Sequence, residues 1–171
     1  EVVSALAAEA GTAIENAHLL ATTRAAEANH RLLLESTGEG IYGLDRDGLC
    51  SFINQAGAAM LGYQPEEILG KNMHELIHHT KQDGSPYPLD ACPIIRACRT
   101  KPHCRMDDEV LWRRDGSSFP AEYAAHPILD EGRITGAVVT FTDITARKQT
   151  EQTFRSLVEG TAGTVGESFF R

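Results

Sequence analysis

The chain has 171 residues, of which 42% are hydrophobic, and this suffices for one domain of roughly 100–150 residues with attached helices. Its 24 acidic and 16 basic residues give a net charge of −8, which argues against nucleic acid as a partner because phosphate binding needs clustered Lys and Arg. No apolar run approaches the roughly 20 residues of a membrane span, so we expect no membrane contact from this segment.

Residues 2–34 predict one long amphipathic helix. They are rich in Ala, Leu and Glu, and their apolar residues recur at steps of three and four. At about 1.5 Å per residue such a helix spans on the order of 50 Å, which is too long to bury its apolar stripe on one small domain. Two compatible interpretations follow: the terminal helix of a neighbouring domain, and the seam of a parallel dimer.

From Gly38 the pattern changes to short strands separated by tight turns. Asp47-Gly48 and Asp115-Gly116 predict hairpins, because Asp-Gly tolerates the positive φ that such turns need. Five strands joined mainly by hairpins predict an antiparallel sheet. The expected strands are 41–44, 49–53, 110–113, 119–125 and 134–141.

About 55 residues between the second and third expected strands predict short helices. The candidates are 54–61, 65–69 and 89–97, with Asn54 and Asp90 as N-caps. One sheet with helices inserted in its middle is an α+β domain, and the helices must cover one face of the sheet.

The junction Asp143-Ile144-Thr145 lies between the last strand and a polar, helix-favouring run. Asp and Thr can cap a helix start, so a helix is expected at 146–159, ending at the glycine-rich segment 160–166. We predict that Asp143, Ile144 and Thr145 couple strain in the sheet to this output helix.

Three segments together resemble the family of PAS sensory domains. Residues 54–63 resemble its N-x-A-x-x-x-x-x-G-Y segment, residues 115–120 its D-G-S-x-F-P hairpin, and residues 143–145 its terminal D-I-T. The resemblance covers residues 36–147 in the right order. It implies a PAS fold: a five-stranded antiparallel sheet with helices inserted between strands two and three, flanked by long N- and C-terminal signalling helices.

The flanks carry a second resemblance, because residues 6–17 look like the final helix of a GAF domain and residues 158–170 resemble a GAF opening. We expect a longer parent protein, a bacterial sensor histidine kinase or a cyclic-di-nucleotide signalling enzyme, that forms a homodimer through the terminal helices. The expected organisation is 1–21, the C-terminal helix of a GAF-like domain; 22–36, a linker helix; 37–145, the PAS domain; and 146–171, a signalling helix and the start of a following GAF-like domain.

No catalytic residue is predicted. Residues 38–43 match G-x-G-x-x-G but open a strand, whereas a dinucleotide-binding loop opens a helix. Residues 73–76, which include His74, resemble the phospho-acceptor box of a histidine kinase. That box belongs on a dimerising helix hairpin, so a phospho-acceptor role is not expected among the inserted helices.

The His and Cys residues of the inserted segment are the alternative site, for zinc or haem, in a gas or redox sensor. The helix that carries the haem-binding His in some PAS domains has none here, and no pair has short zinc spacing. Residues 78–93 resemble a loop variant common among PAS sequences, which should fold by turns and local hydrogen bonds. No metal is therefore favoured. The alternative ligands are His78, His79, Cys92, Cys98 and Cys104.

Other cofactor and compartment expectations follow from the cysteines. The flavin-binding branch requires a reactive-Cys segment that has no match here, so flavin is not expected. The four cysteines lack C-x-x-C spacing and no signal peptide is visible, which predicts reduced thiols in a cytoplasmic protein.

A small-molecule pocket is expected between the sheet and its helices. Trp112 and Tyr123 are of most interest, because a buried indole N–H or phenol O–H needs a partner that a ligand could supply. The alternative is that the same residues only pack the core of a structural dimerisation spacer. The expected lining is Leu44, Phe52, Met60, Ile68, Ile94, Ile95, Leu111, Trp112, Tyr123 and Val138.

Overall fold

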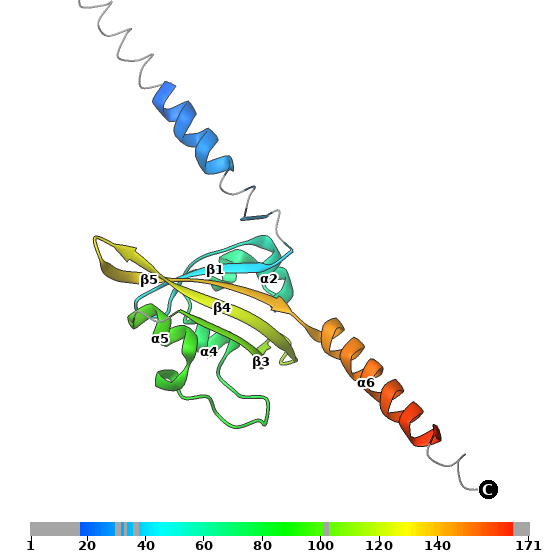
Figure 1. Ribbon diagram of the computed structural model, residues 1–171. Coiled ribbons are helices and arrows are strands. Elements are labelled where there is room, and N and C mark those ends of the chain that lie inside the picture. Colours follow the sequence, from blue (N-terminus) through cyan, green and yellow to red (C-terminus); the bar gives the residue numbers. More distant parts are fainter. Residues whose placement is uncertain (1–17, 30–31, 33, 36–37, 101–102, 166–171) are drawn as a thin grey trace, which may run out of the picture. The chain divides into compact units, whose positions relative to one another are not determined.

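The computed structural model describes residues 18–29, 32, 34–35, 38–100 and 103–165 (Figure 1). It divides into two compact units, residues 1–37 and 38–171. In the first unit, residues 18–29 are helical, as the periodicity predicts, and their side chains are exposed. Residues 2–17 of the predicted helix, including most of the GAF-like segment, lie outside the described residues.

The second unit is built on a five-stranded antiparallel sheet in the order β2-β1-β5-β4-β3 (Figure 1). The helices are inserted between β2 and β3, so the predicted α+β class and PAS topology are confirmed. Four of the strands begin earlier or end later than the sequence predicts; β3 begins six residues earlier, because Arg105, Asp107 and Asp108 interrupt its apolar pattern. The strands are β1 (Gly40–Asp45), β2 (Cys50–Ile53), β3 (Cys104–Trp112), β4 (Ser118–Asp130) and β5 (Arg133–Asp143).

Both predicted Asp-Gly turns form. Gly48 and Gly116 have φ of 82° and 81°, in the left-handed region that favours glycine. In the first turn Asp45 Oδ1 accepts from the Leu49 amide at 2.9 Å, and in the second Asp115 Oδ1 accepts from the Ser117 amide at 2.9 Å. The aspartates therefore fix the turns while glycine supplies the backbone conformation.

The inserted helices are shorter than the sequence predicts. The expected helix 89–97 is two pieces, and Asp90 does not cap the main one: Cys92 is the N-cap of α5, with Pro93 at its first position. Proline suits that position because the first turn needs no N–H there. The helix α4 was not among the candidates. The helices are α2 (Gln55–Leu61), α3 (Pro65–Ile68), α4 (Met73–Ile77), η1 (Leu89–Ala91) and α5 (Pro93–Arg99).

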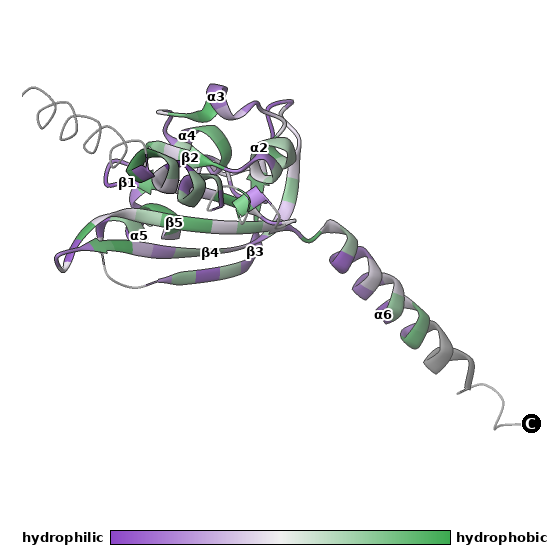
Figure 2. Ribbon diagram, turned by 90° about the horizontal axis from the view of Figure 1, so that it is seen from above, coloured by the Kyte–Doolittle hydropathy of each residue, from purple (hydrophilic) through white to green (hydrophobic). Residues whose placement is uncertain are grey.

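The core lies between one face of the sheet and these helices, with α5 packed on β4 and β5 (Figure 2). The inward side chains of β5 are Ala137, Val139 and Phe141, one every second residue. Burial of such apolar surface supplies most of the stabilisation of the fold. The largest fully buried side chains are Tyr42, Leu44, Leu61, Ile68, Met73, Ile77, His78, Ile95, Leu111, Phe119, Tyr123 and Phe141.

The C-terminal helix α6 (Thr145–Val165) follows β5 directly. It continues past Gly160 and Gly163, so the predicted end at residue 159 is wrong. Isolated glycines cost a helix about 1 kcal/mol each, which weakens it without breaking it. Within the described part of the chain, no helix combines the length and apolar character that a membrane crossing needs.

Asn54 both caps α2, as predicted, and joins that helix to β1. Its Oδ1 accepts from the amides of Gly57 (2.9 Å) and Ile41 (2.8 Å), and its Nδ2 donates to the carbonyl of Glu39 (2.9 Å). Only 2% of Asn54 is exposed, so each lost bond would leave a buried backbone group unpaired.

We therefore expect Asn54→Ala to lower the free energy of unfolding by about 2–3 kcal/mol, measured by urea denaturation. Asn72→Ala is the matched control, because Asn72 caps α4 through the amides of His74 and Glu75 within its own helix. The control should cost about 1 kcal/mol. Equal losses would show that the bonds from Asn54 to β1 add nothing.

Candidate functional site

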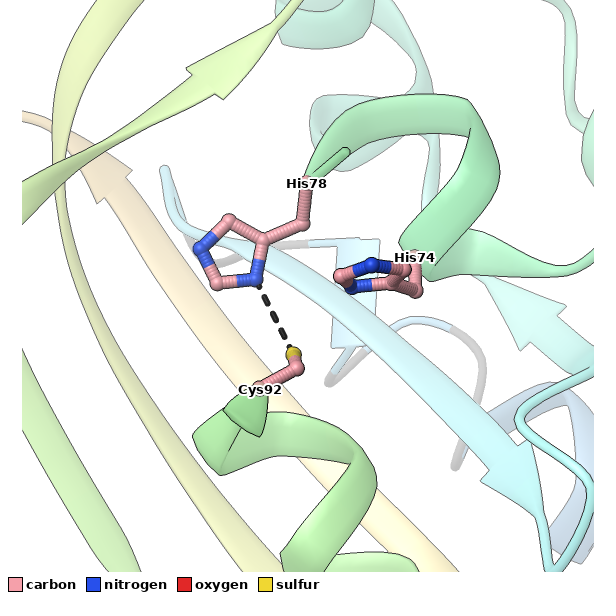
Figure 3. A group of neighbouring side chains, drawn as sticks. All are labelled: His74, His78 and Cys92. Atoms are coloured by element: carbon pink, nitrogen blue, oxygen red, sulfur yellow. Dashed lines mark hydrogen bonds between the residues drawn. The ribbon is translucent and has the colours of Figure 1, made fainter. Parts of the chain in front are cut away.

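A buried polar cluster forms where α4 faces the start of α5. Asn72 caps α4, and the four-residue spacing of His74 and His78 places both imidazoles on one side of it. They are 6% and 1% exposed. Cys92, which is fully buried, completes the group (Figure 3).

His78 is held at both ring nitrogens. Its Nδ1 lies 3.2 Å from Cys92 Sγ, and its Nε2 lies 2.9 Å from Glu109 Oε2. Glu109 also accepts from the hydroxyl of Tyr87 at 2.7 Å and from the hydroxyl of Tyr123. The Glu109 side chain, which is only 18% exposed, thus joins the end of α4, β3, β4 and the loop before η1.

A β-bulge brings Glu109 into this position. The pairing of β3 with β4 shifts between Met106 and Glu109, so two-residue alternation restarts there. Cys104 and Met106 pack on the core before the bulge, and Glu109 and Leu111 face it afterwards. Bulges commonly re-aim a side chain in this way. Without it, the exposed Asp108 would be the residue facing inward.

The loop between α4 and η1 folds by turns and local bonds, as predicted. Lys81 N donates to the Ser85 carbonyl at 2.9 Å, and Asp83 Oδ1 accepts from the Ser85 amide at 2.9 Å. The Tyr87 amide then donates to the His79 carbonyl at 2.7 Å. This closure places the Tyr87 carbonyl 2.9 Å from Nε2 of His74.

The Nδ1 atom of His74 is buried and has no hydrogen-bond partner within the described part of the chain. Ligand atoms of His74, His78 and Cys92 all lie within 4.8 Å of one another. The space between these three ligand atoms is also lined by Tyr42, Met73 and Ile95. It does not admit a water-sized sphere. The arrangement offers two imidazole nitrogens and one sulfur in a nearly closed space.

Electrostatics divide the cluster into a cationic and a neutral imidazole. Burial lowers the pKa of His78, but its bonds to Cys92 and Glu109 raise it to about 9. Burial raises the pKa of Glu109, whereas bonds from His78, Tyr123 and Tyr87 lower it to about 2. His78 and Glu109 therefore form a buried ion pair. Burial lowers the pKa of His74, which keeps that ring neutral.

The other proposed metal ligands lie apart from this group. The exposed His79 ring stacks on Trp112, with 5.4 Å between ring centroids. The Cys98 thiol donates to the Ile94 carbonyl within α5, and burial raises its pKa to about 12. Cys104 is half-buried on β3. Of the five alternative ligands, only His78 and Cys92 lie in this group, and its third member is His74.

The expected pocket lining is only partly brought together. Phe52 lies over Gly43. Val138 points to the face of β5 opposite to that of Ala137 and Val139. The indole N–H of Trp112 donates to the Thr80 carbonyl at 2.8 Å. These three lie outside the core cluster because strand alternation turns them from it. The remaining predicted residues lie in the cluster or against it: Leu44, Met60, Ile68, Ile94, Ile95, Leu111 and Tyr123.

A second polar site lies at the predicted junction. Asp143 Oδ1 accepts from the amide (2.9 Å) and hydroxyl of Thr145, in the first turn of α6. Asp143 Oδ2 accepts from Arg113 at 2.7 Å. Arg113 in turn donates to the Met60 carbonyl at 3.0 Å and lies over the ring of Phe119. One carboxylate thus joins the end of β5, the β3–β4 hairpin and α6.

The family model described as the PAS fold matches residues 28–144 of this chain. The chain belongs to the PAS family. Comparison with solved structures agrees: the PAS domain of an HTR-like protein from Haloarcula marismortui superposes with a TM-score of 0.59 at 22% identity, covering 74% of this chain and 98% of that one. The GAF-like flanks remain predictions.

Two curated relatives of this chain are named as signalling proteins. It is 32% identical over 125 residues to two-component system protein A of Emericella nidulans, and 28% identical over 122 residues to the signal transduction histidine-protein kinase AtoS of Escherichia coli. Each match covers 71% of the chain but only 17% and 19% of the two relatives. The chain therefore spans less than a fifth of the length of each of these relatives.

Sequence reasoning did not find Glu109, Tyr87 or the joining role of His74. Glu109 is the third of three consecutive acids, and a bulge leaves no mark that would single it out. The four-residue spacing of His74 and His78 was the available signal. It was hidden because α4 was not predicted as a helix.

The buried pair should govern how the stability of the PAS domain depends on pH. The pKa of His78 is raised from 6.5 to about 9, so its contribution is complete below pH 6.5 and is lost as the pH rises through 9. The pKa of Glu109 is lowered from 4.5 to about 2, so its contribution is present above pH 4.5 and is lost as the pH falls through 2. Urea denaturation in chelating buffer should show the free energy of unfolding falling between pH 6.5 and 9.

The variant Glu109→Gln should lose about 2–3 kcal/mol at pH 6, because it leaves a buried imidazolium without its anion. Its decline between pH 6.5 and 9 should also be flatter than that of the wild type. His79→Gln, at an exposed imidazole, is the control and should keep the wild-type profile. A parallel profile for Glu109→Gln would exclude the ion pair as the origin of the decline.

Proposed function

We propose that this PAS domain is a sensory and relay module of a multidomain two-component protein, and that its parent is a sensor histidine kinase. The support is the family match together with two curated relatives, one named a two-component system protein and the other a histidine-protein kinase. We assign no catalytic step to the described residues. The four cysteines of the chain form no disulfide, which supports a cytoplasmic location for the parent protein, where thiols remain reduced.

The observation that carries the relay proposal is the position of Asp143 between the sheet and α6. Thr145, whose amide and hydroxyl bind this carboxylate, is the first residue of the helix. Ile144 N also donates to the Pro120 carbonyl of β4 at 3.0 Å. A shift of β4 or β5 therefore changes the groups that hold the first turn of α6.

A relay of this kind requires two arrangements of similar free energy. A ligand or an upstream helix would favour one arrangement, and a few kcal/mol of differential stabilisation is enough to reverse the populations. Arg113 extends the junction to the Met60 carbonyl at the end of α2. The proposed route therefore leads from the helix-covered core to α6.

Exposed apolar side chains on α6 support a homodimer. Phe154, Leu157 and Val158 are 69%, 64% and 51% exposed, and their spacing of three and four residues places them on one helix face. Such a stripe is stabilised when it packs against a second helix. We propose that the partner is the α6 helix of a second copy of this chain.

Asp143→Ala should weaken the start of α6 and change signalling output. Loss of the contacts to Thr145 should cost about 1 kcal/mol, so amide hydrogen exchange in the first turn of α6 should become roughly fivefold faster. In the full-length parent, the ratio of basal to stimulated output should change. Asp115→Ala is the control, because Asp115 binds Ser117 within its own exposed turn. Unchanged basal and stimulated output in Asp143→Ala would refute the relay role.

Phe154→Lys should convert the proposed dimer into a monomer, because it places a charge in the apolar stripe. Native mass spectrometry and light scattering of the 171-residue chain would measure the change. Gln152→Lys is the matched control: residues two apart on a helix do not share a face, so this variant should remain dimeric. A wild-type chain that is monomeric at micromolar concentration would contradict the stripe as a dimer seam.

A further inference from the structure

The two imidazoles of α4 and the thiol of Cys92 are positioned to bind a metal ion. We propose that His74, His78 and Cys92 form a site for a thiophilic d10 cation, Zn²⁺ or Cu⁺. Both ions favour thiolate and imidazole ligands, and the three ligand atoms already lie within 4.8 Å of one another (Figure 3). The inference rests on this geometry and does not depend on the relay function.

The hydrogen bonds at the far side of each ring direct Nδ1 toward the space shared with Cys92. Nε2 of His74 lies 2.9 Å from the Tyr87 carbonyl, and Nε2 of His78 lies 2.9 Å from the Glu109 carboxylate. Both oxygens accept, so each Nε2 carries a hydrogen; the neutral His74 ring then presents its Nδ1 lone pair, and the His78 ring does so once its Nδ1 proton has left. Carbonyl and carboxylate acceptors of this kind orient the histidines of known metal sites.

The unpartnered Nδ1 of His74 gives an independent indication. Its ring is almost fully buried, and this atom has no partner among the described residues. A buried acceptor without a partner is costly, and a water-sized sphere does not fit beside it. A cation coordinated by Nδ1 would remove this cost.

The size of the space selects the kind of ligand. Zinc–nitrogen distances of about 2.0–2.1 Å and zinc–sulfur distances of about 2.3 Å imply nitrogen–sulfur separations of roughly 3.6 Å in a tetrahedral site. His78 Nδ1 and Cys92 Sγ are 3.2 Å apart, so small side-chain rotations suffice. A porphyrin would not fit in a space that excludes a water-sized sphere, so the geometry disfavours haem.

A pocket of about 230 Å³ is a route by which a cation could reach the site from the surface, because His78 is one of its lining residues. Asp83, Asp108 and Glu109 line it with negative charge, against two cations, Lys81 and the His78 imidazolium. Binding would release two protons to solvent, the one on Nδ1 of the His78 imidazolium and the one on the Cys92 thiol, so that imidazole nitrogen and thiolate sulfur become the ligands. Metal and proton would therefore compete for the same two atoms.

The test is a titration of the reduced, chelator-treated 171-residue chain with Co²⁺, as a spectroscopic substitute for zinc, and separately with Cu⁺ against a chromogenic chelator. We expect one equivalent to bind, with a thiolate-to-cobalt charge-transfer band or competition for Cu⁺. Elemental analysis of freshly purified protein then distinguishes zinc from copper, and either metal supports the proposal.

Variants locate the site. Cys92→Ser should abolish the charge-transfer band, and His74→Gln should weaken binding at least tenfold. Glu109→Gln should weaken it about 10–100-fold through the orientation of His78. His79→Gln and Cys104→Ser are controls that should bind as the wild type does. Circular dichroism verifies folding, and His74→Gln is the decisive variant if Cys92→Ser does not fold. The proposal is overturned if neither ion binds, or if His74→Gln binds as tightly as the wild type.

Discussion

The burial of one carboxylate, that of Glu109, is the constraint on which the arrangement of this domain depends. A charge inside a protein is tolerated only when it is paired and hydrogen-bonded, and its partners here are His78, Tyr87 and Tyr123. These residues come from α4, the loop before α5, and β4. The loop, the short helix and the strands must therefore adopt their positions together, because any one of them out of place would leave a charge unpaired in the core.

The same strands connect this carboxylate to the end of the sheet. Tyr123, which binds Glu109, lies opposite Phe141 in the pairing of β4 with β5, and Ala121 lies opposite Asp143. Two residues along each strand therefore separate the buried cluster from the junction with α6. The proposed cation site and the proposed relay junction would therefore act on neighbouring residues of the same two strands.

The repetitive parts of the fold could be predicted from the sequence, because strand alternation and Asp-Gly turns are local signals. The capping contact at the junction could be predicted for the same reason: Asp143 and Thr145 are two residues apart and of capping type. The buried cluster could not, because it depends on contacts between distant residues and on a bulge. Val138 shows the limit within a strand, where an error of one position turns a side chain to the other face.

The bulge in β3 also means that the inward side chains of this strand do not follow a simple two-residue count. Met106 and Glu109 are three residues apart, yet both face the core, because the bulge takes up the extra residue between them. Removing one residue between them would restore uninterrupted alternation and leave both side chains on the same face. In an alignment of related chains, a single gap at this place would therefore separate domains with a regular β3 from domains with a bulged one, without moving the acid out of the core.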